Sequence, residues 1–210
     1  NTYLAIVNVK GKLQVALDDM RTTNAISPEY LEQKADCFRN ASLVFLDANL
    51  SREALSKAIS LARRAKVPIC ADPTSAALAK RIKPHLSKLY LVTPNHSEAS
   101  VLCERVVDPS RSDDALDSAK CLVSQGVRIA IVTLAEFGVC YATSQTSGFV
   151  PSIRTEVVDP TGGGDAMTAA VLFALLNNIP LDDAVRLGVS AATLTLRYPG
   201  AVVPDLSLEK

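Results

Sequence analysis

The sequence predicts an α/β fold built around a mostly parallel central sheet, and two observations support this fold class. From residue 43 onward, short apolar runs typical of buried strands alternate with helical segments that are apolar on one face. Several of the apolar runs end on polar residues, as expected where parallel strands open onto a ligand site. With 210 residues, 48% hydrophobic and 21% charged, the chain can form one large domain with a substantial core.

The elements follow in order from local patterns. Two apolar runs at 3–9 and 13–17 flank Lys10-Gly11-Lys12 and predict a hairpin, followed by a polar loop at 18–21. Ser27 and Pro28 predict the start of a helix that reaches about residue 37. Later strands are expected at 43–46, 67–71, 89–92, 129–133, 139–143 and 149–155. Later helices are expected at 51–66, 75–86 with an interruption at Pro84, 98–103, 113–125, 165–177 and 181–197.

Composition narrows the class of partner. Lys plus Arg and Asp plus Glu both number 22, so net charge gives no reason to expect nucleic acid or an anionic membrane as a partner. The longest uncharged apolar run, 166–176, is shorter than the ~20 residues that span a bilayer. The five cysteines are scattered without a Cys-x-x-Cys pair, which is typical of free thiols in a reducing compartment and predicts a cytoplasmic location. Two histidines are too few for a histidine metal cluster.

The stretch 158–174 is the strongest functional signal. Gly162, Gly163 and Gly164 lead into a helix that is expected to open at Asp165. Glycines let backbone N–H groups face a ligand, and the first turn of a helix has unpaired N–H groups, so the stretch predicts an anion cradle. A carboxylate beside a bound phosphate suggests a general base that takes a proton from an attacking hydroxyl. The alternative is a glycine loop followed by an ordinary helix-capping Asp.

The glycine run at 162–164 does not match the other common glycine motifs of ligand-binding loops. The run lies near the C-terminal end of the sequence, whereas a dinucleotide fingerprint should close the first strand-turn-helix unit. No Lys-Ser or Lys-Thr follows the glycines, which excludes a Walker loop, and no Gly-x-Ser-x-Gly elbow occurs.

Three segments together resemble the ribokinase-like, or PfkB, carbohydrate kinases. Asp159-Pro160-Thr161-Gly162-Gly163-Gly164-Asp165-Ala166 resembles the family's C-terminal signature, Thr93-Pro94-Asn95-His96-Ser97-Glu98 its Pro-Asn-x-x-Glu motif, and 132–138 its nucleotide loop. The resemblance extends from the hairpin to Pro204. It implies a ribokinase-like three-layer αβα sandwich and a single kinase domain over 1–210.

The resemblance also implies a role for each matching residue. Asp165 would be the base, and Gly162, Gly163 and Gly164 would donate N–H groups to the charge on the transferred phosphoryl group. Asn95 and Glu98 would hold Mg²⁺ through water. Thr133, Glu136 and Gly138 would line ATP. Asp159, Thr161 and the loop at Gly200 would surround a monovalent cation, K⁺.

Local alternatives stand beside these roles. Asn95 followed three residues later by Glu98 also matches a helix capping box. Glu136 could be an ordinary solvated loop charge. Ala135 stands where the family's nucleotide loop usually has glycine, so a positive φ there would cost about 1 kcal/mol and weaken the expected ATP contact. Gly163 replaces a commoner alanine, which should be tolerated.

Within the family, 47–50, 67–68, 72–73 and the helix start at 26–29 most resemble pseudouridine kinases, which phosphorylate the 5′-hydroxyl of pseudouridine. The expected partner is a small sugar or nucleoside, and dimers are common among similar kinases. Nothing here corresponds to the family's leading segment, which supplies the lid and most sugar contacts, so we expect the C-terminal, nucleotide-binding part of a longer chain. The rival function is an inactive nucleotide-binding module.

Overall fold

The computed structural model describes residues 2–7 and 13–204. The turn predicted at Lys10-Gly11-Lys12 lies outside these residues. The chain divides into two compact units. Of the described residues, the first unit comprises mainly 18–134 and 140–148, and the second comprises 135–139, 149–204 and most of the N-terminal strand pair.

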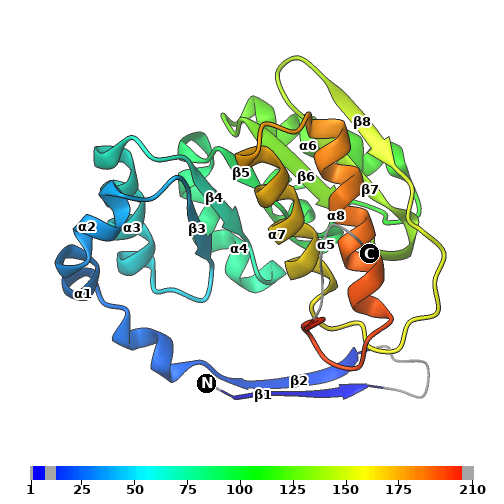
Figure 1. Cartoon of the computed structure of the whole chain (residues 1–210), viewed down its shortest axis with the longest axis horizontal. Coiled ribbons are helices and arrows are strands. Elements are labelled where there is room, and N and C mark those ends of the chain that lie inside the picture. Colours follow the sequence, from blue (N-terminus) through cyan, green and yellow to red (C-terminus); the bar gives the residue numbers. More distant parts are fainter. Residues whose placement is uncertain (1, 8–12, 205–210) are drawn as a thin grey trace. The chain divides into compact units, whose positions relative to one another are not determined.

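The first two strands, β1 (Thr2–Val7) and β2 (Leu13–Asp19), form a two-stranded sheet. A six-stranded sheet follows in the sequential order β3-β4-β5-β6-β7-β8 (Figure 1). Its strands are β3 (Val44–Asp47), β4 (Ile69–Asp72), β5 (Leu91–Val92), β6 (Ile129–Thr133), β7 (Val139–Ala142) and β8 (Ser147–Val150). The pairs from β3 to β6 are parallel, which confirms the predicted mostly parallel sheet.

The helices connect these strands largely as predicted. The α-helices are α1 (Pro28–Gln33), α2 (Ala35–Arg39), α3 (Arg52–Ala65), α4 (Ala76–Ile82), α5 (His96–Cys103), α6 (Ser112–Ser124), α7 (Gly163–Leu176) and α8 (Leu181–Leu196). Short 3₁₀ turns occupy η1 (Arg21–Ala25), η2 (Lys83–Lys88) and η3 (Ala135–Phe137). Three helices begin after a serine whose hydroxyl accepts a backbone N–H: Ser27 before α1, Ser51 before α3 and Ser75 before α4.

Several boundaries differ from the sequence expectation. The single helix expected to reach residue 37 breaks at Lys34, which ends α1 and begins α2. The strand expected at 149–155 ends at Val150, and no strand is assigned to 151–155. The expected polar loop is partly strand, because β2 continues to Asp19. α7 begins at Gly163 rather than Asp165.

The first unit has a continuous apolar core. α3 contributes Ala54, Leu55, Ala58, Ile59, Leu61 and Ala62, the apolar face predicted from its periodicity. β4, β5 and β6 supply almost fully buried residues, as expected of central parallel strands. This core fixes the strand ends, which carry most of the polar residues discussed below.

In the second unit, α7 and α8 pack as a helical pair. Gly188 permits their close approach, because a Cβ there would lie 2.8 Å from Cγ2 of Val171. The pair supports the glycine loop that precedes α7. Among the described residues, no helix is long and apolar enough to cross a membrane.

Candidate active site

In the first unit, polar residues gather at the C-terminal ends of the parallel strands. Asp47 and Asp72 are register partners at the ends of β3 and β4. Asn95, beyond β5, forms an isolated parallel bridge with Thr133, the last residue of β6, and the Thr133 N–H donates to the carbonyl of Pro94 at 3.0 Å. Two predicted site residues, Asn95 and Thr133, are therefore neighbours at the edge where ligands of parallel sheets bind.

Asn95 and Glu98 form the capping box that the sequence left open as an alternative to metal binding. Oδ1 of Asn95 accepts the N–H groups of Ser97 and Glu98 at 2.9 and 3.0 Å. In return, the Glu98 carboxylate accepts the backbone N–H of Asn95 at 2.9 Å and its Nδ2–H at 2.7 Å. Each carboxylate oxygen thus receives one hydrogen bond and keeps further lone pairs. Capping fixes the geometry of the pair, and it leaves acceptor capacity for a water bound to a metal.

Glu98 is a buried acid. Its side chain is 3% exposed, and burial raises its pKa to about 7, with a further increase from the nearby charge of Asp72. Hydrogen bonds from Asn95 oppose this rise. A buried carboxyl group whose pKa is raised in this way, at the C-terminal ends of parallel strands, is a feature typical of functional sites.

Thr93 was not among the predicted site residues. It is 4% exposed, and its hydroxyl donates to Oδ2 of Asp72 at 3.3 Å. Asp72 also accepts the N–H of Thr74 at 2.6 Å, which matches the turn role considered for Asp72 before Pro73. Its position in the sequence could have indicated a site residue, because Thr93 is a polar residue that directly follows an apolar strand and precedes Pro94.

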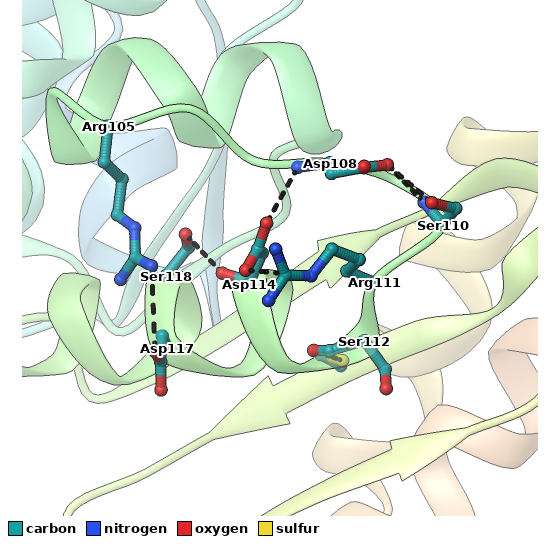
Figure 2. Close-up of polar contacts among 9 residues, drawn as sticks. Arg105, Asp108, Ser110, Arg111, Ser112, Asp114, Asp117 and Ser118 are labelled. Carbon is teal, nitrogen blue, oxygen red and sulfur yellow. Dashed lines mark hydrogen bonds and ion pairs between the residues drawn. The ribbon is translucent and has the colours of Figure 1, made fainter.

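α5, which begins after Asn95 and carries Glu98, is anchored to α6 through the segment that joins these two helices (Figure 2). The Asp108 carboxylate accepts the N–H and hydroxyl of Ser110 at 2.9 and 2.7 Å, and its own N–H donates to Asp114 at 3.4 Å. Hydrogen bonding from Ser110 holds the pKa of Asp108 below its usual value. Arg105 pairs with Asp117 at 3.6 Å. These contacts fix α5 at its C-terminal end, away from the capping box.

The predicted nucleotide loop contains a strained residue. Ala135 has a φ of +50°, which confirms that this position takes the left-handed conformation that favours glycine. Gly138 has a φ of +115°, and a Cβ there would lie 2.5 Å from the carbonyl oxygen of Val150, so glycine is required. The carbonyl of Glu136 accepts the hydroxyl of Ser152 at 2.5 Å, and its side chain is exposed.

The glycine run leads directly into the first turn of α7. Gly162 has a φ of +81° and occupies the position before α7, with no side-chain cap. A Cβ on Gly162 would lie 2.1 Å from the carbonyl oxygen of Ala201, whereas one on Gly164 would meet no atom within 4 Å. The N–H groups of the first turn lack intrahelical acceptors, and the space beside Gly164 is open, so an anion can approach them.

Asp165 lies in this first turn with its side chain exposed. Its carboxylate makes no hydrogen bond to the described part of the chain. It is therefore available to accept a proton from a bound hydroxyl group.

Asp159 joins two loops of the second unit. Its carboxylate accepts the N–H of Thr161 at 2.8 Å and that of Gly200 at 3.1 Å. Hydrogen bonding from the Thr161 side chain, and then from these two N–H groups, holds the pKa of Asp159 below its usual value. The three residues predicted to surround a monovalent cation are therefore neighbours. Within the described ranges, no cluster of three or more His, Cys, Asp or Glu side chains is placed to hold a metal ion.

Comparison with known proteins establishes the family. Residues 1–207 match the sequence profile described as pfkB family carbohydrate kinase. The chain belongs to the pfkB family of carbohydrate kinases. The sequence resemblance drawn from three short segments is thereby confirmed over almost the whole chain.

Individual relatives agree with this assignment. The chain is 30% identical to a pseudouridine kinase of Escherichia coli strain K12, over 99% of this chain and 66% of that protein. A putative sugar kinase from Clostridium perfringens has a similar structure, with a TM-score of 0.83, 24% identity, and coverage of 99% of this chain and 64% of that one. A putative ribokinase II from E. coli, solved in complex with ATP and Mg²⁺, has a TM-score of 0.76 at 17% identity, covering 91% and 63%. The chain thus spans slightly less than two thirds of each of these proteins. The two solved structures confirm the ribokinase-like fold.

Proposed function

We propose that the protein transfers the γ-phosphoryl group of ATP to a primary hydroxyl of a sugar or nucleoside, with pseudouridine as the acceptor and pseudouridine 5′-phosphate as the product. The single observation that carries the proposal is the exposed carboxylate of Asp165 in the same helical turn as an open glycine cradle. Family membership supports the reaction class. The 30% identical pseudouridine kinase supports the acceptor.

The chain's own residues would divide the chemistry as follows. Asp165 accepts the proton of the acceptor hydroxyl as its oxygen attacks the phosphorus atom. The backbone N–H groups at Gly162, Gly163 and Gly164 donate to the oxygens of the transferred group, where negative charge must be stabilised. Thr133, Glu136 and Gly138 bind the phosphates and ribose of the nucleotide. Substitution of Asp165 should therefore affect turnover far more than nucleotide binding.

The strand-end residues of the first unit fit Mg²⁺ bound through water. Oδ1 of Asn95 already accepts two N–H groups, so Asn95 would act by orienting the Glu98 carboxylate. That carboxylate supplies the oxygen ligands that Mg²⁺ prefers, and each of its two oxygens accepts one hydrogen bond. A water-mediated contact uses their remaining lone pairs without breaking the capping box. When bound there, Mg²⁺ would neutralise phosphate charge, as in other phosphoryl-transfer enzymes.

A product assay tests the function. The longest natural form of the protein is incubated with ATP, Mg²⁺ and, separately, pseudouridine, uridine, ribose and fructose, and the product is located by ³¹P NMR. We expect turnover with pseudouridine and a phosphate on its 5′-oxygen. Turnover only with ribose or fructose would show that pseudouridine is not the acceptor. The proposed phosphoryl transfer would still stand, because a ribokinase-like or fructokinase-like activity uses the same cradle.

One observation favours a second function, an inactive nucleotide-binding module. The positive φ of Ala135 strains the loop that is proposed to contact ATP. Nucleotide binding without turnover on any acceptor in the panel would favour this second function.

Two further properties belong to the proposal. The neighbouring Asp159, Thr161 and Gly200 support K⁺ activation, which an assay with K⁺ replaced by a bulky organic cation would test. Leu4, Ile6, Val15 and Leu17 are each about half exposed on β1 and β2, which supports a homodimer formed through this apolar surface. Light scattering of the purified protein would give its mass in solution and so test the homodimer.

A cytoplasmic location is also part of the proposal. Five free cysteines support it, because thiols stay reduced in that compartment.

A further inference from the structure

Arg81 and Thr74, in the β4–α4 region, hold the loop that follows β3, and these two residues are called the clamp. Nη1 of Arg81, on α4, donates to three consecutive carbonyl oxygens, those of Ala48, Asn49 and Leu50, at 3.2, 3.2 and 2.9 Å. This nitrogen carries two hydrogens, so at least one of them is shared between two carbonyls. Among the described residues, no carboxylate forms a salt bridge with Arg81. The hydrogen bonds of its guanidinium group therefore go to backbone carbonyls of one short loop.

Thr74 holds the same loop by accepting a hydrogen bond from a backbone N–H of that loop. Its hydroxyl accepts the N–H of Ala48 at 3.1 Å, and the same N–H also lies 3.2 Å from the carbonyl oxygen of Asp72. Thr74 has a φ of +66°, a conformation that is strained for a β-branched residue. Strain of this kind persists where the surrounding contacts enforce it, and it concentrates at functional sites.

The clamped loop presents two polar side chains at the C-terminal edge of the sheet. Asp47 is exposed, and one of its carboxylate oxygens accepts the N–H of Asn49 at 2.6 Å. The side-chain amide of Asn49 has no hydrogen-bond partner within the described part of the chain. Such a carboxylate and amide can accept from and donate to the hydroxyl groups of a sugar ring.

The order of the strands indicates which substrate this loop faces. β6 ends at Thr133, which is assigned to the nucleotide, and β5 leads to Asn95 and Glu98, which are assigned to Mg²⁺. With the nucleotide assigned to the end of β6 and Mg²⁺ to the residues after β5, the neighbouring strand ends that remain for the acceptor are those of β3 and β4. This step rests on the proposed function.

We infer that Arg81 is a positioning residue for the acceptor. It acts through the backbone of Ala48–Leu50, and with Thr74 it fixes the loop that carries Asp47 and Asn49 before substrate arrives. Pre-ordering the loop removes the conformational cost of ordering it when the sugar ring of the acceptor binds. Loss of the clamp should therefore weaken acceptor binding and leave nucleotide binding unchanged.

The test compares Arg81→Met, Arg81→Lys and Lys80→Met in the longest natural form of the protein. Lys80 is exposed on the same helix and provides the matched control. We expect Arg81→Met to raise the acceptor KM about 10-fold while the ATP KM stays within about twofold, because the clamp acts on acceptor binding alone. Arg81→Lys should recover part of the loss, since an ammonium group can also donate to several carbonyls.

Hydrogen exchange and melting temperature separate positioning from general damage. Exchange at the amides of Ala48 and Asn49 should quicken in Arg81→Met, with the amides of α6 unchanged. An unchanged acceptor KM, or equal rises in both KM values, would overturn the inference for a folded variant. If Arg81→Met does not fold, the same criteria apply to Arg81→Lys. A wild-type protein silent with every acceptor would overturn the proposed function, and this inference with it.

Discussion

The carboxylate of Glu98 accepts both the backbone N–H and the side-chain N–H of Asn95, at 2.9 and 2.7 Å. This pair begins α5, and it also supplies the oxygens proposed to hold Mg²⁺. Helix capping and metal binding therefore do not exclude each other here. The two roles can be separated by substitutions that preserve one of them.

We expect Asn95→Ser to keep the fold and weaken the response to Mg²⁺. Serine is as good a helix cap as asparagine, whereas Asn95→Ala should lower the free energy of unfolding by about 1 kcal/mol. Thermal unfolding measures the cap, and initial rates across a Mg²⁺ titration measure the metal role. If Asn95→Ser has the wild-type Mg²⁺ dependence, the metal role of Asn95 is wrong.

The titration of Glu98 should make stability depend on pH. Its folded pKa is about 7 and its unfolded value is about 4.5. The contribution of the protonated group is therefore fully present below pH 4.5 and is lost as pH rises through 7, by about 3 kcal/mol in total. The difference in unfolding free energy between wild type and Glu98→Gln should show this fall.

The control for this titration is Glu53→Gln, on the exposed surface of α3. The same measurement on this variant gives the pH dependence that removal of an exposed carboxyl produces. A constant difference for Glu98→Gln would show that the buried carboxyl does not retain its proton.

Ala135→Gly should stabilise the protein by about 1 kcal/mol, because glycine takes a φ of +50° without the clash of a Cβ. Ala77→Gly, on the exposed side of α4, is the matched control and should instead destabilise by roughly 0.5–1 kcal/mol. Chemical denaturation of the three proteins checks both signs. Nucleotide affinity measured on the same samples shows whether strain at Ala135 limits ATP binding.

The two outer glycines of the run should respond differently to alanine. Gly162→Ala should destabilise by more than about 1 kcal/mol, since its φ is +81° and the new Cβ would lie 2.1 Å from the carbonyl oxygen of Ala201. Gly164→Ala should raise stability by roughly 0.5–1 kcal/mol, because it lies in a helix with open space around it. The added methyl would occupy the approach to the proposed cradle, so we expect lower kcat. A Gly164→Ala variant with normal kcat would argue against an anion at this position.

Local signals in the sequence predicted much of the fold. β6 lies at its expected bounds, and the helix expected at 51–66 forms as α3, Arg52–Ala65. The capping box was also predictable, since Asn95 and Glu98 are three residues apart. The break at Lys34 was not, because no proline or glycine marks it.

Long-range contacts account for most of what the sequence could not predict. The bond from Arg81 to Leu50 joins residues 31 positions apart, and nothing in either segment indicates the other. The positive φ of Thr74 depends on the loop it contacts. The start of α7 was placed two residues late because Gly163 and Gly164 are poor helix formers, yet the first turn includes them.

The most direct test of the central claim is the turnover of Asp165→Asn in a coupled ADP-release assay, with nucleotide binding measured on the same sample. General base catalysis contributes roughly 10²- to 10⁴-fold, so we expect kcat to fall within that range while the ATP dissociation constant stays within about twofold. The carboxylate is exposed, so folding should be unaffected. A variant that retains wild-type kcat would contradict the assignment of Asp165 as the base.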